Sequence, residues 1–425
     1  MRKLLIILAV SALALAAAAP ASASRSVRYG IQDDAWLLHG PGSLEDRIAQ
    51  LDALGVDLVR FTVRWDQVAR RQPRNARSHL DPAYNWSQPD AVLRGLRARG
   101  IAPLVTLLGS PRWANGGRAA QWAPRRGASF ANFAFATQRR YLWVRDWLIW
   151  NEPNQRRWLR PTSASVYTTK LLNPAYRAIK QARRSARVGG GVTAPRGSRG
   201  GVSPVAWIRG MDRARARLDA YAHHPYPLRP KRETPFSGGC AHCETITLAT
   251  VERLISRVRR AFGNKRIWLT EYGYQTSPPD RLLGVSPATQ ARHIGSSALR
   301  AYRAPFVDML VHFMVRDDGH MPGWQSGLYS RTGRAKLAAK AFPMPLAQVS
   351  RRGTRTLVWG QMRPGSGRQT YRLRVKRGGR WSWVGGNRRT NSRGFFSVSV
   401  RAGRGGAVQA WHPTSRTFGV ALVVR

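Results

Sequence analysis

The stretch Arg28-Tyr-Gly-Ile-Gln-Asp-Asp34 decides which α/β fold is predicted for this chain. Its apolar run leads straight into two carboxylates, and seven further short apolar runs follow along the chain, each with an amphipathic segment after it. An open doubly wound sheet is expected to carry a glycine-rich phosphate turn after its first strand. Because Gln32-Asp33-Asp34 is not such a turn, the stretch favours a closed barrel of eight β/α units.

The spacing of the apolar runs supports the barrel. From residue 28 to residue 307 is a span of 279 residues in seven steps, about 40 residues each. A crossover between parallel strands requires a connection of this length, usually a helix. Residues 24–343 are therefore predicted to form an eightfold (β/α) TIM barrel. Its strands should begin near Arg28, Val56, Ile101, Val144, Arg187, Asp219, Arg266 and Val307.

Two helix starts are predicted from capping residues. Ser43 precedes an amphipathic run that ends at Gly55, and serine is a favoured N-cap because its hydroxyl accepts a hydrogen bond from a free backbone N–H. Ser87 is expected to cap a second helix, which ends at Gly100.

The sequence changes character after Phe342. Pro343 and Pro345 break the helical pattern, and short alternating apolar and polar runs follow, separated by glycine-rich turns. This pattern predicts a small, all-β sandwich-like domain over residues 346–425. Its strands should begin near Thr356, Tyr371, Trp381, Phe395, Ala407 and Val420.

The charge of the chain is extreme. It has 71 basic and 21 acidic residues, a net charge of +50, yet 43% of it is hydrophobic and 16 residues are tryptophan, which excludes global disorder. Such charge suggests a polyanionic partner. Arginine makes up 63 of the basic residues, so GC-rich codon usage is an alternative source of the excess. The 107 residues after Asp318 contain 21 basic residues and no acid.

The N-terminus predicts export. Arg2 and Lys3 precede an apolar run and the small residues Ala21-Ser-Ala23, the pattern of a signal peptide over residues 1–23. An uncleaved anchor helix is the alternative, although the run is short for a membrane span. We expect a secreted protein, extracellular or associated with the cell wall, with no membrane span after cleavage.

The cysteines form one close pair, Cys240 and Cys243. In an oxidising compartment such a pair is expected to form a disulfide. The alternative is a metal site that adds His242 and either His223 or His224. Structural zinc usually takes two ligand pairs, so the disulfide is favoured and no metal is expected.

Two glutamates end apolar runs in matching places. Glu152 follows the fourth predicted strand and Glu271 the seventh. The active site of a β/α barrel is built at the C-terminal ends of its strands, so these carboxylates should face one cavity. Such a pair is the apparatus of glycosidic bond hydrolysis. The alternative is two structural glutamates paired with the abundant arginines.

The residues that flank these glutamates favour the catalytic interpretation over the structural one. Trp150-Asn-Glu-Pro-Asn154, Thr270-Glu-Tyr-Gly273 and Tyr221-Ala-His-His-Pro-Tyr226 resemble the clan of retaining β/α-barrel glycoside hydrolases, which includes cellulases, mannanases and β-xylosidases. The resemblance covers residues 28–343 loosely. The chain departs from it at the end of the eighth strand, where many members carry a tryptophan and this chain reads Val311-His-Phe-Met-Val-Arg-Asp-Asp318.

The resemblance implies a role for each matching residue. Glu152 would be the general acid/base, its pKa raised by the negative charge of the nucleophile Glu271. Asn151 would hydrogen-bond the sugar 2-hydroxyl, and Arg60 would hold Glu271 ionised. The remaining expected substrate-binding residues are His224, Tyr226, Trp113 and Trp65. Tryptophans near strands are more often core, and this alternative stays open for Trp113, Trp65 and Trp150.

The predicted function is therefore a secreted, cofactor-free retaining glycoside hydrolase of a β-linked polysaccharide or oligosaccharide. Its basic C-terminal domain is expected to contact an anionic cell-wall polymer or acidic polysaccharide. A non-catalytic carbohydrate- or cell-wall-binding protein on the same scaffold is the alternative. No specific nucleic-acid partner is expected, because no recognisable reading module is present.

Overall fold

The computed structural model describes residues 26–240 and 242–425. The signal peptide predicted for residues 1–23 lies outside the described residues. Within the described part of the chain, no helix combines the length and the apolar character that crossing a membrane requires.

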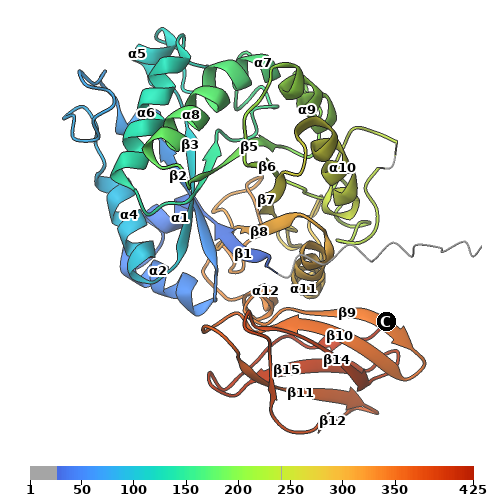
Figure 1. The fold of residues 1–425 in the computed structure, drawn as a ribbon. Helices are drawn as coiled ribbons and strands as arrows, with labels where there is room; N and C mark the ends of the chain where they lie inside the picture. Colours follow the sequence, from blue (N-terminus) through green and yellow to red (C-terminus); the bar gives the residue numbers. More distant parts are fainter. Residues whose placement is uncertain (1–25, 241) are drawn as a thin grey trace, which may run out of the picture.

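Eight parallel strands close into a barrel, which confirms the predicted fold (Figure 1). Each strand pairs with the next along the chain, and β8 pairs with β1 to close the ring. The strands are β1 Arg28–Gln32, β2 Leu58–Arg64, β3 Ala102–Leu108, β4 Asp146–Ile149, β5 Arg187–Thr193, β6 Ala220–His223, β7 Arg266–Tyr272 and β8 Val307–Phe313.

Helices surround the barrel and connect its strands. They are α1 Asp34–His39, α2 Leu44–Ala53, α3 Trp65–Val68, α4 Ser87–Ala98, α5 Arg112–Asn115, α6 Gly127–Arg140, α7 Ala164–Val166, η1 Tyr167–Leu172, α8 Asn173–Ala182, α9 Pro204–Arg213, η2 Leu248–Thr250, α10 Val251–Phe262, α11 Pro287–Arg303 and α12 Leu337–Ala341.

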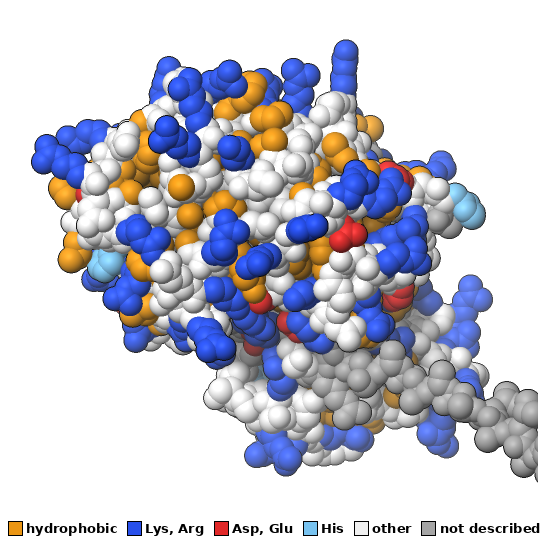
Figure 2. All heavy atoms as spheres, turned by 45° about the horizontal axis from the view of Figure 1, so that its top comes forward, with side chains coloured by type: hydrophobic (Ala, Val, Ile, Leu, Met, Phe, Trp, Pro, Cys, Tyr) orange, Lys and Arg blue, Asp and Glu red, His pale blue; other side chains and the backbone are white. Residues whose placement is uncertain are grey.

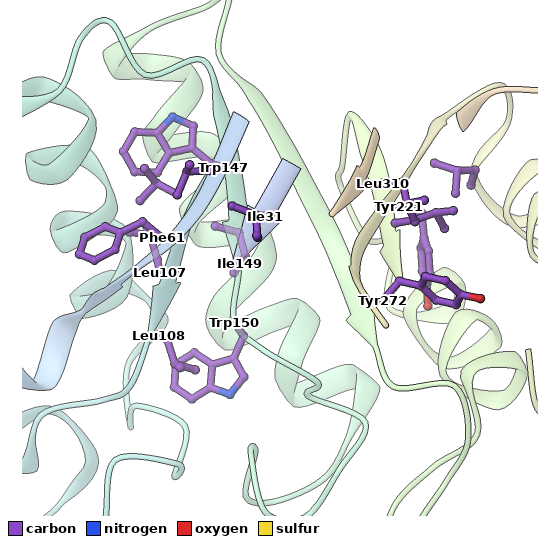
Figure 3. Close-up of a cluster of buried hydrophobic side chains, with 14 of the residues drawn as sticks. Ile31, Phe61, Leu107, Leu108, Trp147, Ile149, Trp150, Tyr221, Tyr272 and Leu310 are labelled. Atoms are coloured by element: carbon purple, nitrogen blue, oxygen red, sulfur yellow. The ribbon is translucent and has the colours of Figure 1, made fainter. Parts of the chain in front are cut away.

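Strand alternation divides the core into two layers. In β2, Val59 and Phe61 face the surrounding helices, where they join the main apolar cluster with Trp147 (Figure 3). Leu58 points into the barrel and packs with Leu104, Trp268 and other strand residues in a separate cluster. Successive side chains of a strand alternate between its faces, so Arg60 lies on the same inner side as Leu58. The fold thus places a charged residue inside the barrel.

The C-terminal segment forms antiparallel sheets, also as predicted. One sheet has the order β14-β10-β9, and the other has the order β12-β11-β15-β16, with β13 paired to β11 and β17 to β15. The strands are β9 Leu346–Arg352, β10 Arg355–Gln361, β11 Thr370–Arg377, β12 Arg380–Trp383, β13 Arg388–Arg389, β14 Phe395–Arg401, β15 Ala407–His412, β16 Thr417–Phe418 and β17 Leu422–Val423.

Aromatic contacts join these sheets to the barrel. The Tyr302 ring on α11 lies 5.4 Å from the Trp359 ring on β10 and 4.9 Å from the Phe395 ring on β14. Phe395 also contacts Tyr29 of β1 edge to face, at 6.4 Å. In Figure 1, β9 and β10 lie next to α11 and α12, whereas β12 lies on the far side. The two parts therefore share a core.

Basic side chains spread over the visible surface, and carboxylates are few on it (Figure 2). The positive charge is therefore not confined to the C-terminal sheets.

Candidate active site

The two glutamates meet at the C-terminal end of the barrel. One carboxylate oxygen of each lies within 4.8 Å of the other, and a nitrogen of His224 lies within the same distance of both. A retaining glycosidase requires its two carboxyl groups to be about 5–5.5 Å apart, whereas an inverting enzyme keeps them about 6.5–9.5 Å apart. The separation therefore fits the retaining geometry.

Irregular backbone directs both glutamates into the cavity. After β4, Trp150 has φ 70° and Glu152 has φ 36°, a left-handed conformation that side chains other than glycine rarely adopt. In β7 the register with β8 shifts between Leu269 and Tyr272, around Glu271. Such bulges re-aim a side chain and are common next to active sites. Strain of this kind persists where the surrounding structure holds it, and it clusters at functional sites.

Arg60 holds Glu271 from the barrel interior. Its Nη1 donates to Oε1 of Glu271 at 2.6 Å, and both side chains are almost fully buried. The Tyr226 hydroxyl donates to Oε2 of Glu271 at 3.2 Å. Burial raises the pKa of Tyr226 well above its ordinary value, so this hydroxyl remains a donor. Each carboxylate oxygen of Glu271 thus accepts a hydrogen bond, one from a guanidinium and one from a hydroxyl.

The same guanidinium orients Asn151. Its Nη2 donates to Oδ1 of Asn151 at 2.6 Å, and its other nitrogens donate to Gln32 and Thr106. Because an arginine can only donate, the amide oxygen of Asn151 must face Arg60. The Asn151 NH₂ group therefore remains available to donate, and Asn151 lines the cavity.

Contacts fix the proton position of His224. Its Nε2 lies 3.3 Å from Nη1 of Arg60, so Nε2 must be the unprotonated acceptor. The proton then sits on Nδ1, which lies 3.0 Å from Oε1 of Glu152 and 3.5 Å from Oε2 of Glu271. Burial lowers the pKa of His224 to about 3, so the ring is neutral. His224 donates to Glu152 and bridges the two carboxylates.

The cause of the altered Glu152 pKa differs from the sequence-based expectation. The pKa is raised to about 6, but the largest cause is burial. Arg157 and Arg60 oppose the shift, and Glu271 does not contribute to it. The expectation that the charge of Glu271 raises this pKa was wrong, because Arg60 already compensates that charge at 2.6 Å.

Two cavities meet beside Glu152. The larger, about 930 Å³, extends along β1 and β2 and is lined by Glu152 and Glu271 among others. The smaller, about 220 Å³, lies toward β5–β7 and is lined by Glu152 but not by Glu271. Arg157 and Trp324 line both cavities. Glu152 therefore stands at the junction, while Glu271 faces the larger side only.

Trp324 is a site residue that the sequence did not indicate. It lies in the loop after β8, and its ring is 5.0 Å from the Tyr226 ring and 5.6 Å from the Phe313 ring. Its side chain is 37% exposed, so part of the ring is open to a ligand. The signal was weak because Trp324 follows the end of β8 by 11 residues, in a loop of no regular pattern. An aromatic surface is thus present although the strand itself ends in Phe313.

Trp65 and Trp113 line neither of the two cavities. Trp65 is fully buried and packs on Trp113, Phe130 and Phe133 with ring centroids 5.4–5.6 Å apart. The Trp113 indole donates to the carbonyl of Ala69 instead of facing a cavity. The expectation that these two residues stack on sugar was wrong: Trp65 is core beneath Phe130 and Phe133 of α6, and the partly buried Trp113 packs edge to face on Trp65. Trp150 is also fully buried.

Cys240 and Cys243 are joined by a disulfide. Two histidines of the alternative metal site, His223 and His224, are engaged elsewhere. His223 contacts Thr193 and the carbonyl of Ile246 through its two ring nitrogens, and His224 bridges the glutamates. Glu152, His224 and Glu271 could together offer atoms to a cation. The guanidinium of Arg60 already supplies positive charge to that group.

Comparison of the structure with solved structures gives clear matches at low sequence identity. A glucosidase from Croceicoccus marinus has a TM-score of 0.61 and 12% identity, over 92% of this chain and 96% of that one. A family 39 glycoside hydrolase from Bacteroides cellulosilyticus WH2 has a TM-score of 0.60 and 15% identity, over 93% and 81%. The family 39 enzyme from Xanthomonas axonopodis pv. citri has a TM-score of 0.55 and 16% identity, over 91% and 94%.

No protein-family model matches the sequence, and comparison with curated protein sequences finds no match. The matches to solved structures show that the fold is that of the β/α-barrel glycoside hydrolases, which the resemblance in the sequence had indicated. At these identities the matches establish the fold alone.

Proposed function

We propose that this protein is a retaining glycoside hydrolase that cleaves a β-linked polysaccharide or oligosaccharide, with Glu271 as nucleophile and Glu152 as acid/base. The observation that carries the proposal is the pair of carboxyl groups, with oxygens within 4.8 Å at the mouth of the barrel. Two structural glutamates would each be expected to pair with an arginine. Glu271 does, but the one ion-pair partner of Glu152 in the described residues is the neutral His224.

The two cavities support a placement of the two sides of the scissile bond. The sugar whose anomeric carbon is attacked must lie over Glu271, in the larger cavity. The leaving group must lie beyond Glu152, in the smaller one. Trp324 borders both and offers a face on which a sugar ring can stack.

Each step has a residue to perform it. A carboxylate oxygen of Glu271 forms a bond to the anomeric carbon while the glycosidic C–O bond breaks, and Glu152 gives its proton to the leaving oxygen. Water then attacks the same carbon, Glu152 takes a proton from it, and Glu271 leaves as carboxylate. The free NH₂ of Asn151 can donate to the 2-hydroxyl as the transition state develops.

The test is an activity screen on aryl β-glycosides and plant polysaccharides, followed by NMR of the first product. A retaining enzyme releases the β anomer first. Release of the α anomer would show inversion and contradict the double displacement. Sugar binding without any turnover would favour the non-catalytic alternative.

The pH dependence follows from Glu152. Its pKa of about 6 means that the acid form required for leaving-group protonation predominates below pH 6 and is lost above it. We expect kcat/KM for substrates with poor leaving groups to fall about tenfold per pH unit above this value. Since Arg157 lowers this pKa, Arg157→Gln should move the alkaline limb to higher pH. A profile that is flat from about pH 5 to pH 8 would contradict this assignment.

Trp324 should act in binding more than in chemistry. Removing its ring in Trp324→Ala is expected to raise KM about tenfold, because the ring supplies stacking area and no proton or charge. Trp383→Ala, which removes an exposed tryptophan of the C-terminal sheet, is the matched control for aryl glycosides. Equal KM values for the two variants would remove Trp324 from the binding site.

The place of action is part of the same proposal. The N-terminal pattern over residues 1–23 supports export, so the substrate would be met outside the cell or at the cell wall. Detection of the protein in the culture medium, starting after Ala23, would test it.

A further inference from the structure

The second C-terminal sheet exposes an unusual outer face. On its other side, Tyr371, Leu373 and Val375 of β11 are buried in the core of this domain. Arg372 and Arg374, which alternate with these residues, point outward and meet aromatic side chains from β12, β15 and β16. We call this surface the aromatic–arginine face; its members are Arg372, Arg374, Trp381, Trp383, Trp411 and Phe418.

The arginines of this face stack on rings. The Arg372 guanidinium lies 4.1 Å from the Trp383 ring centroid. Arg374 lies between two rings, 4.5 Å from Trp381 and 3.8 Å from Phe418. Planar guanidinium groups favour such stacking. Arg372 donates through Nη2 and Arg374 through Nε and Nη2, so Nη1 of each remains for a ligand. The arginines are thereby held in place before any ligand arrives.

No carboxylate neutralises these arginines. No acidic residue follows Asp318 in the sequence, and Arg372 and Arg374 form no ion pair among the described residues. Their hydrogen bonds go to the carbonyl of Gly385 and the amide oxygen of Gln409. Lys376 and Arg389 add two exposed charges at the edges of the same face. The face is therefore positively charged, pre-ordered and open.

The active-site cavity differs in character from this face. Asp33, Asp34, Glu152, Glu271 and Asp318 line the larger cavity together with Arg60, Arg64, Arg70 and Arg157. Charges of both signs therefore meet in this cavity. The face, by contrast, combines rings that can stack on sugars with guanidinium groups that match carboxylates or sulfates.

We infer that the aromatic–arginine face is a binding site for an acidic polysaccharide, separate from the site of cleavage. Rings of Trp383 and Trp411 contact the apolar faces of sugar units, and the stacked arginines pair with their carboxylate or sulfate groups. The choice of a polysaccharide over another polyanion rests on the proposed function of the barrel. The positive charge of this domain then retains the enzyme on the polymer.

The test is affinity electrophoresis of the full chain in gels that contain polygalacturonate, with hydroxyethylcellulose as the neutral polymer and a DNA duplex as the other polyanion. All proteins carry Glu271→Gln, so that no polymer is cut, while aryl glycoside hydrolysis is followed separately in the parent with Glu271. Point variants are used because the sheets share a core with the barrel. Failure of binding and failure of hydrolysis are thus distinguishable.

We expect polygalacturonate to retard the protein, less so at high salt because screening weakens charge contacts. Trp383→Ala should lower the affinity about fivefold, and Lys376→Gln with Arg389→Gln about tenfold. The matched control, Arg352→Gln with Arg401→Gln, removes two exposed charges from the other sheet and should change it less than about twofold.

Three results would overturn the inference. The control pair could weaken binding as much as the face pair, which would make the effect one of net charge. Trp383→Ala could leave binding unchanged although Lys376→Gln with Arg389→Gln weakens it, which would exclude stacking. DNA could bind as tightly, with the same response to every variant, which would make the face a general polyanion surface.

Discussion

Glu271→Gln should reduce the hydrolysis of every β-glycoside at least about 10⁴-fold, because the amide cannot form the covalent intermediate on which both steps depend. The amide oxygen can still accept from Arg60, which lies 2.6 Å from Oε1 of the present carboxylate, and the NH₂ group can donate to the Tyr226 hydroxyl, which lies 3.2 Å from Oε2. The fold should therefore persist. The measurement is kcat/KM on an aryl β-glycoside, beside thermal unfolding to verify the structure.

Glu152→Gln is the informative comparison, because the acid/base assists the leaving group and the nucleophile does not. Its loss should be about 10²–10⁴-fold on substrates with poor leaving groups and much smaller in the first step with activated aryl leaving groups. Added azide, which needs no general base, should then restore turnover in Glu152→Gln only. If the leaving group has the same effect on both variants, the roles of the two glutamates are not divided as proposed.

Most of the barrel could be predicted because its signal is local and repeated. The predicted strand starts at Arg28, Arg187, Arg266 and Val307 coincide with the starts in the structure, and the other four lie within two residues. Ser43 is the N-cap of α2, with a full capping box to Asp46. Ser87 was misplaced: the N-cap of α4 is Trp86, and the Ser87 hydroxyl donates to Asn85 instead. A serine can be assigned as an N-cap only when the other possible hydrogen-bond partners of its hydroxyl are known, and here Asn85 takes that hydroxyl.

Strands without an apolar signature were missed. Strand β9 follows Pro345 directly and ends in two exposed arginines, so its sequence does not show the alternation that marked the other strands. It is held in place by pairing with β10, a long-range contact that no local pattern encodes. The short strands β13 and β16 are likewise defined by their partners, β11 and β15.

Some residues of the candidate site could likewise be predicted from the sequence, and others could not. The glutamates were identifiable because each ends an apolar strand, and a carboxylate there requires a reason. Trp65 also directly follows a barrel strand, β2, but Phe130 and Phe133 of α6 pack over it. Trp324, by contrast, reaches the cavity from a loop without regular structure. Whether a tryptophan faces core or cavity depends on what packs over it. That information is tertiary.

Arg60→Leu is expected to be the most destabilising substitution at the site, because it leaves the carboxylate of Glu271 buried without its guanidinium. Removing one partner of a buried pair costs about 3–5 kcal/mol, which for a protein of this size lowers the Tm by about 4–6 °C. The same change also removes the donor that fixes the amide of Asn151 at 2.6 Å. Activity should be lost together with stability, as measured by kcat/KM and by thermal unfolding.

A double variant separates the charge from the packing. In Arg60→Leu with Glu271→Leu no buried charge is left alone, so most of the lost stability should return while activity stays absent. Arg99→Leu is the control: its guanidinium lies 3.6 Å from Glu45 at the exposed surface, and its removal should change the free energy of unfolding by less than about 1 kcal/mol. If the double variant is instead as unstable as Arg60→Leu, the contacts of Arg60 with Gln32, Thr106 and Asn151 hold the barrel mouth together, and the pairing with Glu271 serves catalysis alone.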